Sequence, residues 1–149
     1  MMRTILICAM LALDASTVAL APDFSGTWTL ISAGEAPAGL EPQQLVVTQT
    51  ATELTVVRTT SRGESEITYR LDGAETVESN MLGDTKIRAA WDGDALTVTR
   101  TRTLNAPSGP VADTSTERWV LEDGVLAITS SRTLPAGQPR AQTSRYRRP

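Results

Sequence analysis

The stretch D-F-S-G-T-W-T-L, residues 23–30, decides the fold because it opens the first of a long series of strands. From Phe24 onward, short segments rich in Thr and Val alternate polar and apolar residues, and turn signals separate them at intervals of roughly ten residues. No segment shows the apolar spacing of a long helix. The sequence therefore predicts an all-β domain: an antiparallel up-and-down meander of about eight to ten strands, which closes into a barrel and so removes its free edges.

Turn signals divide this series of strands. Asp-Gly is the strongest short-range signal for a hairpin, since both central residues of a type I′ turn need positive φ. It occurs three times, and we expect each pair to join two neighbouring strands: Asp72-Gly73, Asp92-Gly93 and Asp123-Gly124. The segment from Asn105 to Asp113 is rich in Pro and Gly, and it is predicted to be a surface loop between hairpins.

The residues before Pro22 differ in composition from the rest of the chain. Arg3 precedes an apolar run from Ile5 to Leu13, and Ala19 and Ala21 are small residues suited to cleavage. This pattern is typical of a signal peptide, and the run has about half of the roughly 20 residues that a membrane-spanning helix needs. We expect a signal peptide over residues 1–21, cleaved after Ala19 or Ala21, and one domain over residues 22–149. The mature protein is then periplasmic or secreted and has no membrane span.

The composition excludes several kinds of chemistry. The 149 residues include no histidine, which removes Ser-His-Asp triads and His-ligated metals. The only cysteine, Cys8, lies in the predicted signal peptide, so we expect neither a disulfide nor a lipid anchor. The net charge of −3 does not point to nucleic-acid binding. We expect no enzymatic activity, no catalytic or metal site and no cofactor. Turn chemistry and solvent exposure explain the two close acidic pairs, Asp92 with Asp94 and Glu64 with Glu66.

Three similar segments, residues 54–60, 96–102 and 126–132, each begin apolar and end cationic. Residues of one parity share a face of a strand, so an inward-facing apolar series would continue into arginine at one end of the barrel. Guanidinium groups match carboxylates and phosphates, and an apolar floor beneath them suits a small amphipathic or anionic ligand. These arginines are the candidate ligand-binding residues: Arg58, Arg100, Arg102 and Arg132.

A second interpretation places the same arginines in solvent. A β-bulge would reverse the parity, or the strand ends would project beyond the barrel. The arginines would then form exposed ion pairs with carboxylates such as Glu64, Glu66, Glu75, Glu78 or Glu117. Six aromatic residues are predicted to pack in the core: Phe24, Trp28, Tyr69, Trp91, Trp119 and Tyr146.

The sequence Phe24-Ser25-Gly26-Thr27-Trp28-Thr29-Leu30 resembles the G-x-W signature that opens the first strand of lipocalins, fatty-acid-binding proteins and other members of the calycin superfamily. The resemblance implies a lipocalin-like barrel in which Trp28 closes one end beneath a basic residue, Arg145 or Arg147. We expect a monomeric, non-enzymatic barrel that binds a small amphipathic or anionic ligand at its arginine-lined end. The alternative is an envelope interaction or structural module whose interior is filled by side chains and whose loops or edges bind a partner protein. The segment from Ala33 to Gln43 is too short for the helical lid of fatty-acid-binding proteins.

Overall fold

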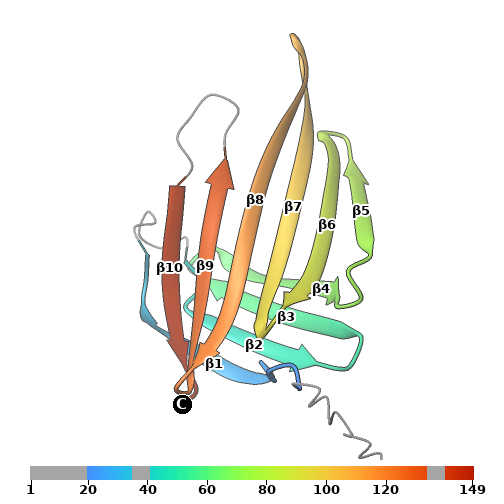
Figure 1. The fold of residues 1–149 in the computed structure, drawn as a ribbon. Coiled ribbons are helices and arrows are strands. Elements are labelled where there is room, and N and C mark those ends of the chain that lie inside the picture. Colours follow the sequence, from blue (N-terminus) through green and yellow to red (C-terminus); the bar gives the residue numbers. More distant parts are fainter. Residues whose placement is uncertain (1–19, 35–40, 134–139) are drawn as a thin grey trace, which may run out of the picture.

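The computed structural model describes residues 20–34, 41–133 and 140–149, and most of the predicted signal peptide lies outside them. The described part contains ten strands and no helix, so the all-β prediction is confirmed (Figure 1). The strands form one antiparallel sheet that curls into a nearly closed barrel. They are β1 (Gly26–Ser32), β2 (Gln44–Gln49), β3 (Glu53–Thr60), β4 (Gly63–Arg70), β5 (Glu75–Asn80), β6 (Gly83–Asp92), β7 (Ala95–Ala106), β8 (Gly109–Glu122), β9 (Val125–Thr133) and β10 (Arg140–Arg147).

The barrel closes through its first and last strands. β1 pairs with β10, with Leu30 opposite Tyr146, so the strand order is β4-β3-β2-β1-β10-β9-β8-β7-β6-β5. The two free edges of the sheet are β4 and β5, and β4 approaches β6 across the gap between them. The prediction of a hairpin at Asp72-Gly73 is therefore wrong. This turn carries the chain from one edge of the sheet to the other, and β4 and β5 do not pair.

The other two predicted hairpins are present, and one predicted loop is not. The β6–β7 hairpin turns through Gly93 and Asp94, because Asp92 pairs with Ala95, so its turn is one residue later than the dipeptide predicts. Asp123-Gly124 joins β8 to β9, where the φ angles of 50° and 76° are both positive, as a type I′ turn requires. The segment predicted to be a loop, Asn105 to Asp113, instead continues the β7–β8 ladder to the pair Ala106 and Gly109. Pro110 is tolerated because it lies near the end of that ladder.

The hydrophobic core fills the end of the barrel that carries the β6–β7 and β8–β9 turns, here called the base (Figure 1). Inward-facing residues of nearly every strand meet there, and all six predicted core aromatics belong to this cluster. Phe24 stacks on Trp91 at 5.7 Å and meets Trp119 edge to face at 5.9 Å between ring centroids. The largest fully buried side chains are Trp28, Trp119, Tyr69, Tyr146, Phe24, Leu45, Leu54, Leu96, Leu126, Val56 and Val98.

Trp28 closes the base beneath an arginine, as the resemblance implies, but the arginine is Arg148. Its guanidinium carbon lies 4.3 Å from the centroid of the Trp28 ring, and its NH2 group donates to the carbonyls of Asp23 and Ser25 at 3.2 and 2.9 Å. The expectation of Arg145 or Arg147 is wrong because both point outward on β10, where Tyr146 is the inward residue. Gly26 leaves room for this cap, since a Cβ at its φ of +129° would lie 3.2 Å from Nε of Arg148.

Candidate functional site

Two of the predicted site arginines, Arg58 on β3 and Arg100 on β7, lie above the apolar core and face the barrel interior. Each follows inward residues of the same parity, Leu54 and Val56 on β3 and Leu96 and Val98 on β7, all of which are buried. The side chain of Arg58 is 19% exposed and that of Arg100 is 28% exposed. Because inward and outward residues alternate regularly on both strands, the two arginine side chains point into the lumen.

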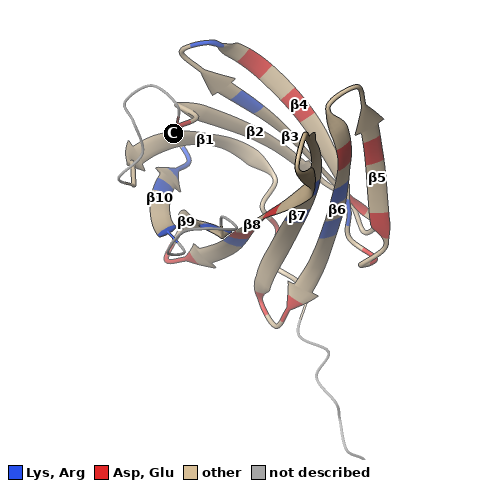
Figure 2. Cartoon of the chain, turned by 90° about the horizontal axis from the view of Figure 1, so that it is seen from above, with Lys and Arg blue, Asp and Glu red and all other residues tan. Residues whose placement is uncertain are grey.

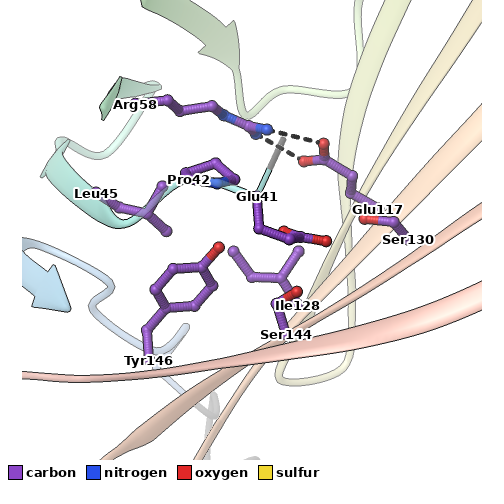
Figure 3. A pocket seen from close by; sticks show the side chains of 9 residues that line it. All are labelled: Glu41, Pro42, Leu45, Arg58, Glu117, Ile128, Ser130, Ser144 and Tyr146. Atoms are coloured by element: carbon purple, nitrogen blue, oxygen red, sulfur yellow. Dashed lines mark hydrogen bonds and ion pairs between the residues drawn. The ribbon is translucent and has the colours of Figure 1, made fainter. Parts of the chain in front are cut away.

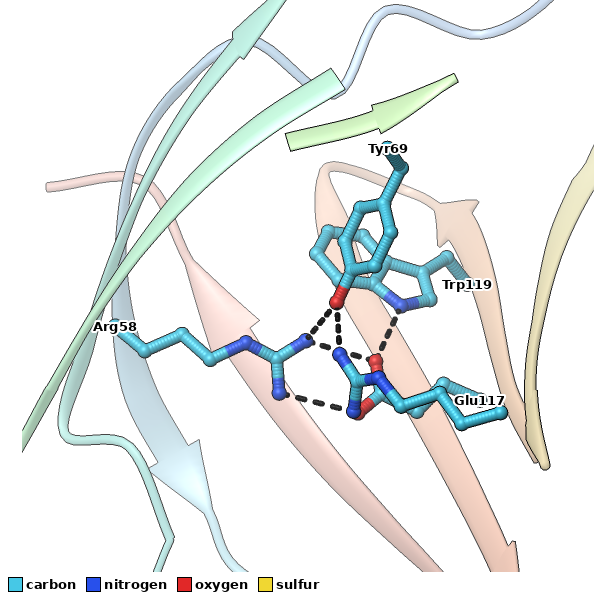
Figure 4. Close-up of polar contacts among 5 residues, drawn as sticks. Arg58, Tyr69, Glu117 and Trp119 are labelled. Carbon is cyan, nitrogen blue, oxygen red and sulfur yellow. Dashed lines mark hydrogen bonds and ion pairs between the residues drawn. The ribbon is translucent and has the colours of Figure 1, made fainter. Parts of the chain in front are cut away.

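Glu117 on β8 is the carboxylate between these two cations (Figure 4). Arg58 donates to both of its oxygens, NH1 to Oε1 at 3.0 Å and NH2 to Oε2 at 2.8 Å. Arg100 is more distant, with NH1 at 3.5 Å from Oε1. The bidentate geometry assigns Glu117 mainly to Arg58, because paired parallel N–H···O bonds are the strongest form of this contact.

Tyr69 on β4 and Trp119 on β8 complete this cluster, which we call the lumen cluster: Arg58, Tyr69, Arg100, Glu117 and Trp119. The Tyr69 hydroxyl accepts hydrogen bonds from NH2 of Arg100 and, at 3.3 Å, from NH2 of Arg58. Nε1 of Trp119 donates to Oε2 of Glu117 at 3.2 Å. The cluster thus connects β3 and β4 with β7 and β8 across the interior, on either side of the gap in the sheet.

Burial and charge act in opposite directions on the lumen cluster. Burial alone would raise the pKa of Glu117, but the charge and hydrogen bonds of Arg58 outweigh it and hold that pKa below its ordinary value. Burial would likewise lower the pKa of Arg58, and Glu117 reverses the shift and raises it. Burial raises the pKa of Tyr69. The cluster therefore contains two guanidinium cations, one carboxylate and a neutral phenol, which leaves one positive charge uncompensated.

The other two predicted residues, Arg102 and Arg132, face the same way. Arg102 is the next inward residue after Arg100 toward the β7–β8 turn, and Arg132 on β9 lies opposite Ser115, which also pairs with Arg100. Arg132 forms an ion pair with Asp113, with NH2 at 2.5 Å from Oδ2 and Nε at 3.1 Å from both oxygens. A hydrogen bond from Arg132 lowers the pKa of Asp113, and the charges of Arg132 and Arg102 add to that shift. Both arginines are exposed, so of the four predicted residues the structure brings only Arg58 and Arg100 together in a partly buried site.

Five carboxylates were expected to pair with the arginines if these faced solvent. Of the five, only Glu117 lies beside the predicted arginines. Glu64 and Glu66 on β4 and Glu75 and Glu78 on β5 are exposed on the two edge strands (Figure 2). In the described residues, the ion pair at that edge joins Glu75 to Lys86 at 3.5 Å. These four carboxylates are therefore open to solvent at the edges of the sheet, whereas Arg58 and Arg100 point into the barrel.

A small cavity of about 30 Å³ lies beside the lumen cluster (Figure 3). Its polar lining includes Arg58, Glu117, Ser130, Ser144 and Tyr146. This volume corresponds to about one water molecule. Nε of Arg58 is buried and has no hydrogen-bond partner in the described part of the chain. The lumen cluster is consequently packed on this side, and an anion larger than water would have to approach Arg100 instead.

Sequence reasoning assigned Tyr69 to the core and named Glu117 only as one of several possible partners. The signal for Glu117 was its parity, since it shares a face with Trp119 and Leu121, both of which the alternation places inside. Tyr69 gave no such signal, because its role depends on β4 facing β7 across the gap. That arrangement follows from the closure of the barrel, which the order of turns did not specify.

Comparison with solved structures shows that the chain has the fold of the calycin barrels. It is similar to the REP1-NXSQ fatty acid transporter, with 15% identity and a TM-score of 0.58 over 84% of this chain and 95% of that chain. It is similar to human cRBP IV, with 17% identity and a TM-score of 0.55 over 86% and 99%. It is also similar to the fatty-acid-binding protein of Manduca sexta, with 12% identity and a TM-score of 0.52 over 83% and 97%. Neither a protein-family model nor a curated protein matches the sequence.

These neighbours are binding and transport proteins rather than enzymes, which agrees with the lipocalin-like barrel expected from the sequence. Among the described residues, no group of three or more Cys, Asp or Glu side chains is placed to hold a metal ion. No helix in that part of the chain is long and apolar enough to cross a membrane. The lumen cluster is partly buried and carries a net positive charge, so it can attract and orient an anion by charge-assisted hydrogen bonds.

Proposed function

We propose that this protein binds a small amphipathic anion in its barrel, with the headgroup at Arg100. The observation that carries the proposal is the uncompensated positive charge of the lumen cluster. Arg58 is neutralised by a bidentate contact with Glu117, whereas Arg100 lies 3.5 Å from the same carboxylate and is the more exposed of the two cations. An anion at Arg100 would make the cluster neutral, and the surrounding protein would strengthen that contact relative to water.

The apolar part of the ligand would extend away from the base, because packed side chains already fill the lumen below the cluster. Leu104 and Val111 pair directly on the same face of β7 and β8, beyond Arg102. Both are partly buried and supply an apolar surface for a short chain. Arg102 lies beside this path and would attract the anion toward it. The names of the fatty acid transporter and the fatty-acid-binding protein among the structural neighbours support a ligand of this class.

Calorimetric titration tests this function with alkyl carboxylates of increasing length and with the alcohols of the same length. The carboxylates are expected to bind at least about tenfold more tightly than the alcohols, which is what one charge-assisted hydrogen bond contributes. Arg100→Gln should abolish that difference. Arg118→Gln, at an exposed ion pair with Asp92 on the outer surface, is the matched control and should preserve it. Equal binding of acid and alcohol, or equal effects of the two variants, would contradict the proposal.

The small cavity favours a second function, a structural or interaction module. A cavity of about 30 Å³ is far below the roughly 300 Å³ of a common ligand pocket. The free edges β4 and β5, and the exposed Met81 and Leu82 between β5 and β6, offer surfaces for a partner protein instead. This function predicts that no alkyl anion binds and that the protein purified from its native envelope carries a protein partner rather than a small molecule.

We further propose that the mature protein is a non-enzymatic monomer exported to the periplasm or the medium. Residues 1–21 carry the sequence features of a signal peptide, and the chain from Pro22 onward is tied to the barrel. Gln49 Nε2 donates to the carbonyl of Pro22 at 2.9 Å, and its Oε1 accepts from the amide of Phe24 at 2.9 Å. The mass of the protein recovered from its own host tests this, since cleavage after Ala19 or Ala21 predicts two different masses. Recovery of the full-length chain alone would contradict export by this route.

A further inference from the structure

The lumen cluster has a fixed charge balance that limits which anion it can accept. Arg58 and Arg100 contribute two positive charges, and Glu117 contributes one negative charge. All three side chains are less than a third exposed, at 19%, 28% and 13%. In such surroundings an unpaired charge is expensive, so a bound headgroup is most stable when its charge is equal and opposite to the one that remains.

We propose that Glu117 is a specificity residue that restricts this site to singly charged headgroups, such as a carboxylate or a sulfonate, and excludes a doubly charged phosphate monoester. This inference rests on the proposed function, since it concerns the anion that Arg100 would bind. With Glu117 ionised, one monoanion neutralises the cluster. A dianion would leave an excess negative charge beside the Glu117 carboxylate, and like charges in partly desolvated surroundings repel each other.

The contacts of Glu117 keep its carboxylate in place as the one negative charge of the lumen cluster. Arg58 bonds to both of its oxygens, Trp119 donates to Oε2, and NH1 of Arg100 makes a longer contact of 3.5 Å with Oε1, so the carboxylate is held by three close donors and one distant one before any ligand arrives. On its other side the cavity of about 30 Å³ is too small for an exchange of headgroups. Arg100 retains the Tyr69 hydroxyl as a neutral neighbour. A ligand therefore adds to Arg100 and does not replace Glu117.

The other charged and titratable groups near Glu117 do not alter this balance. Burial keeps Tyr69 on β4 and Tyr146 on β10 neutral, because it raises the pKa of both hydroxyls. Glu41, which precedes β2, lines the cavity beside Arg58 and Glu117, whose lining does not include Arg100, and accepts a hydrogen bond from Gln142 at 2.8 Å. Asp113 is paired with Arg132 near the exposed end of the barrel. Arg102 is exposed, so solvent screens its charge.

Octyl sulfonate and octyl phosphate, used well below the concentrations at which they form micelles, provide a matched test by calorimetry. The sulfonate carries one charge at every pH used, whereas the phosphate carries nearly two at about pH 8 and closer to one at about pH 5. The wild-type protein is expected to bind the sulfonate at least about tenfold more tightly than the phosphate at about pH 8. Lowering the pH to about 5 should remove most of that difference, because the phosphate becomes a monoanion.

Glu117→Gln should reverse the preference at about pH 8, since the cluster would then carry two uncompensated positive charges. Asp92→Asn, at an exposed ion pair on the outer surface, is the control and should leave the preference unchanged. If Glu117→Gln does not fold, the pH dependence of the wild-type preference still decides the matter. A site that binds both ligands equally at about pH 8 overturns the role of Glu117 but leaves anion binding intact. A protein that binds neither ligand at either pH overturns the proposed function and this inference with it.

Discussion

Arg58 and Glu117 meet inside the barrel with N–O distances of 3.0 and 2.8 Å, although the strands β2, β1, β10 and β9 separate their strands in the sheet. The contact crosses the lumen and does not follow the ladder of backbone hydrogen bonds. Together with the contact between Tyr69 and Arg100, it connects the two halves of the sheet at the level of the gap. The lumen cluster is thus a brace for the fold as well as a candidate binding site.

Arg58→Met is expected to lower the free energy of unfolding by about 3 to 5 kcal/mol, because it leaves the largely buried Glu117 carboxylate with the more distant Arg100 as its nearest cation. Arg118→Met breaks the exposed ion pair with Asp92 and should cost at most about 1 kcal/mol. Urea unfolding followed by tryptophan fluorescence measures both values. Equal effects of the two substitutions would show that the contact across the lumen does not brace the barrel.

Glu117 also makes the free energy of unfolding depend on pH in the acidic range. Its pKa in the folded protein lies below the ordinary value of 4.5, since Arg58 outweighs the effect of burial. A carboxyl group with a depressed pKa contributes stability above its unfolded pKa, and that contribution is lost as the pH falls through the folded value. We expect the free energy of unfolding to decline below about pH 4.5. In Glu117→Gln the decline should be shallower, and Asp92→Asn should resemble the wild type in urea titrations at successive pH values.

Tyr69 and Tyr146 predict that the protein also loses stability at alkaline pH. Burial raises the pKa of both hydroxyls above the ordinary value of 10.0. A raised pKa contributes stability that is complete below the unfolded value and is lost as the pH rises. We expect stability to decline above about pH 10, with the tyrosinate absorbance appearing together with unfolding. Tyr146→Phe should reduce this dependence. Tyrosinate that forms while the far-ultraviolet dichroism of the sheet is unchanged would contradict the assignment.

Arg148→Ala is expected to destabilise the protein by about 1 to 2 kcal/mol, because it removes the contact with the Trp28 ring and two hydrogen bonds to backbone carbonyls. Arg147→Ala, at the exposed position next to it, should change stability by no more than about 0.5 kcal/mol. Thermal unfolding of the two variants tests the assignment. A larger effect at Arg147 would place the cap one residue earlier.

Local patterns were sufficient to predict most of the fold. Alternation placed Trp91, Leu96, Val98 and Trp119 in the core, and the turn at Asp123-Gly124 forms as its dipeptide indicates. The error at Asp72-Gly73 has a physical reason: the local signal specifies a tight turn, but it does not specify whether the flanking strands pair. Pairing at that point depends on which edges of the curled sheet meet, and this is a property of the whole barrel.

Local sequence patterns also predicted only part of the candidate site. The parity of β3 and β7 predicted that Arg58 and Arg100 face inward, because parity is a local property of each strand. The choice of partner was beyond local reasoning, since Arg58 and Glu117 are 59 residues apart in sequence. Arg148 was missed for a similar reason. It follows the last residue of β10, so strand alternation did not determine where its side chain points.

Because β1 pairs with β10, the order of the strands along the sequence can be changed without changing their order in the sheet. Because the sheet runs β4-β3-β2-β1-β10-β9-β8-β7-β6-β5, a circular permutant that starts at β5 and ends at β4 would have every strand beside its neighbour in sequence. Arg148 already touches the carbonyl of Asp23, so a short linker can join those ends, and new termini can be opened at Asp72-Gly73. Such a permutant exchanges its most distant strand pairing for a local one. Since folding rates rise as contacts become more local, it should fold faster than the natural order while keeping the same barrel.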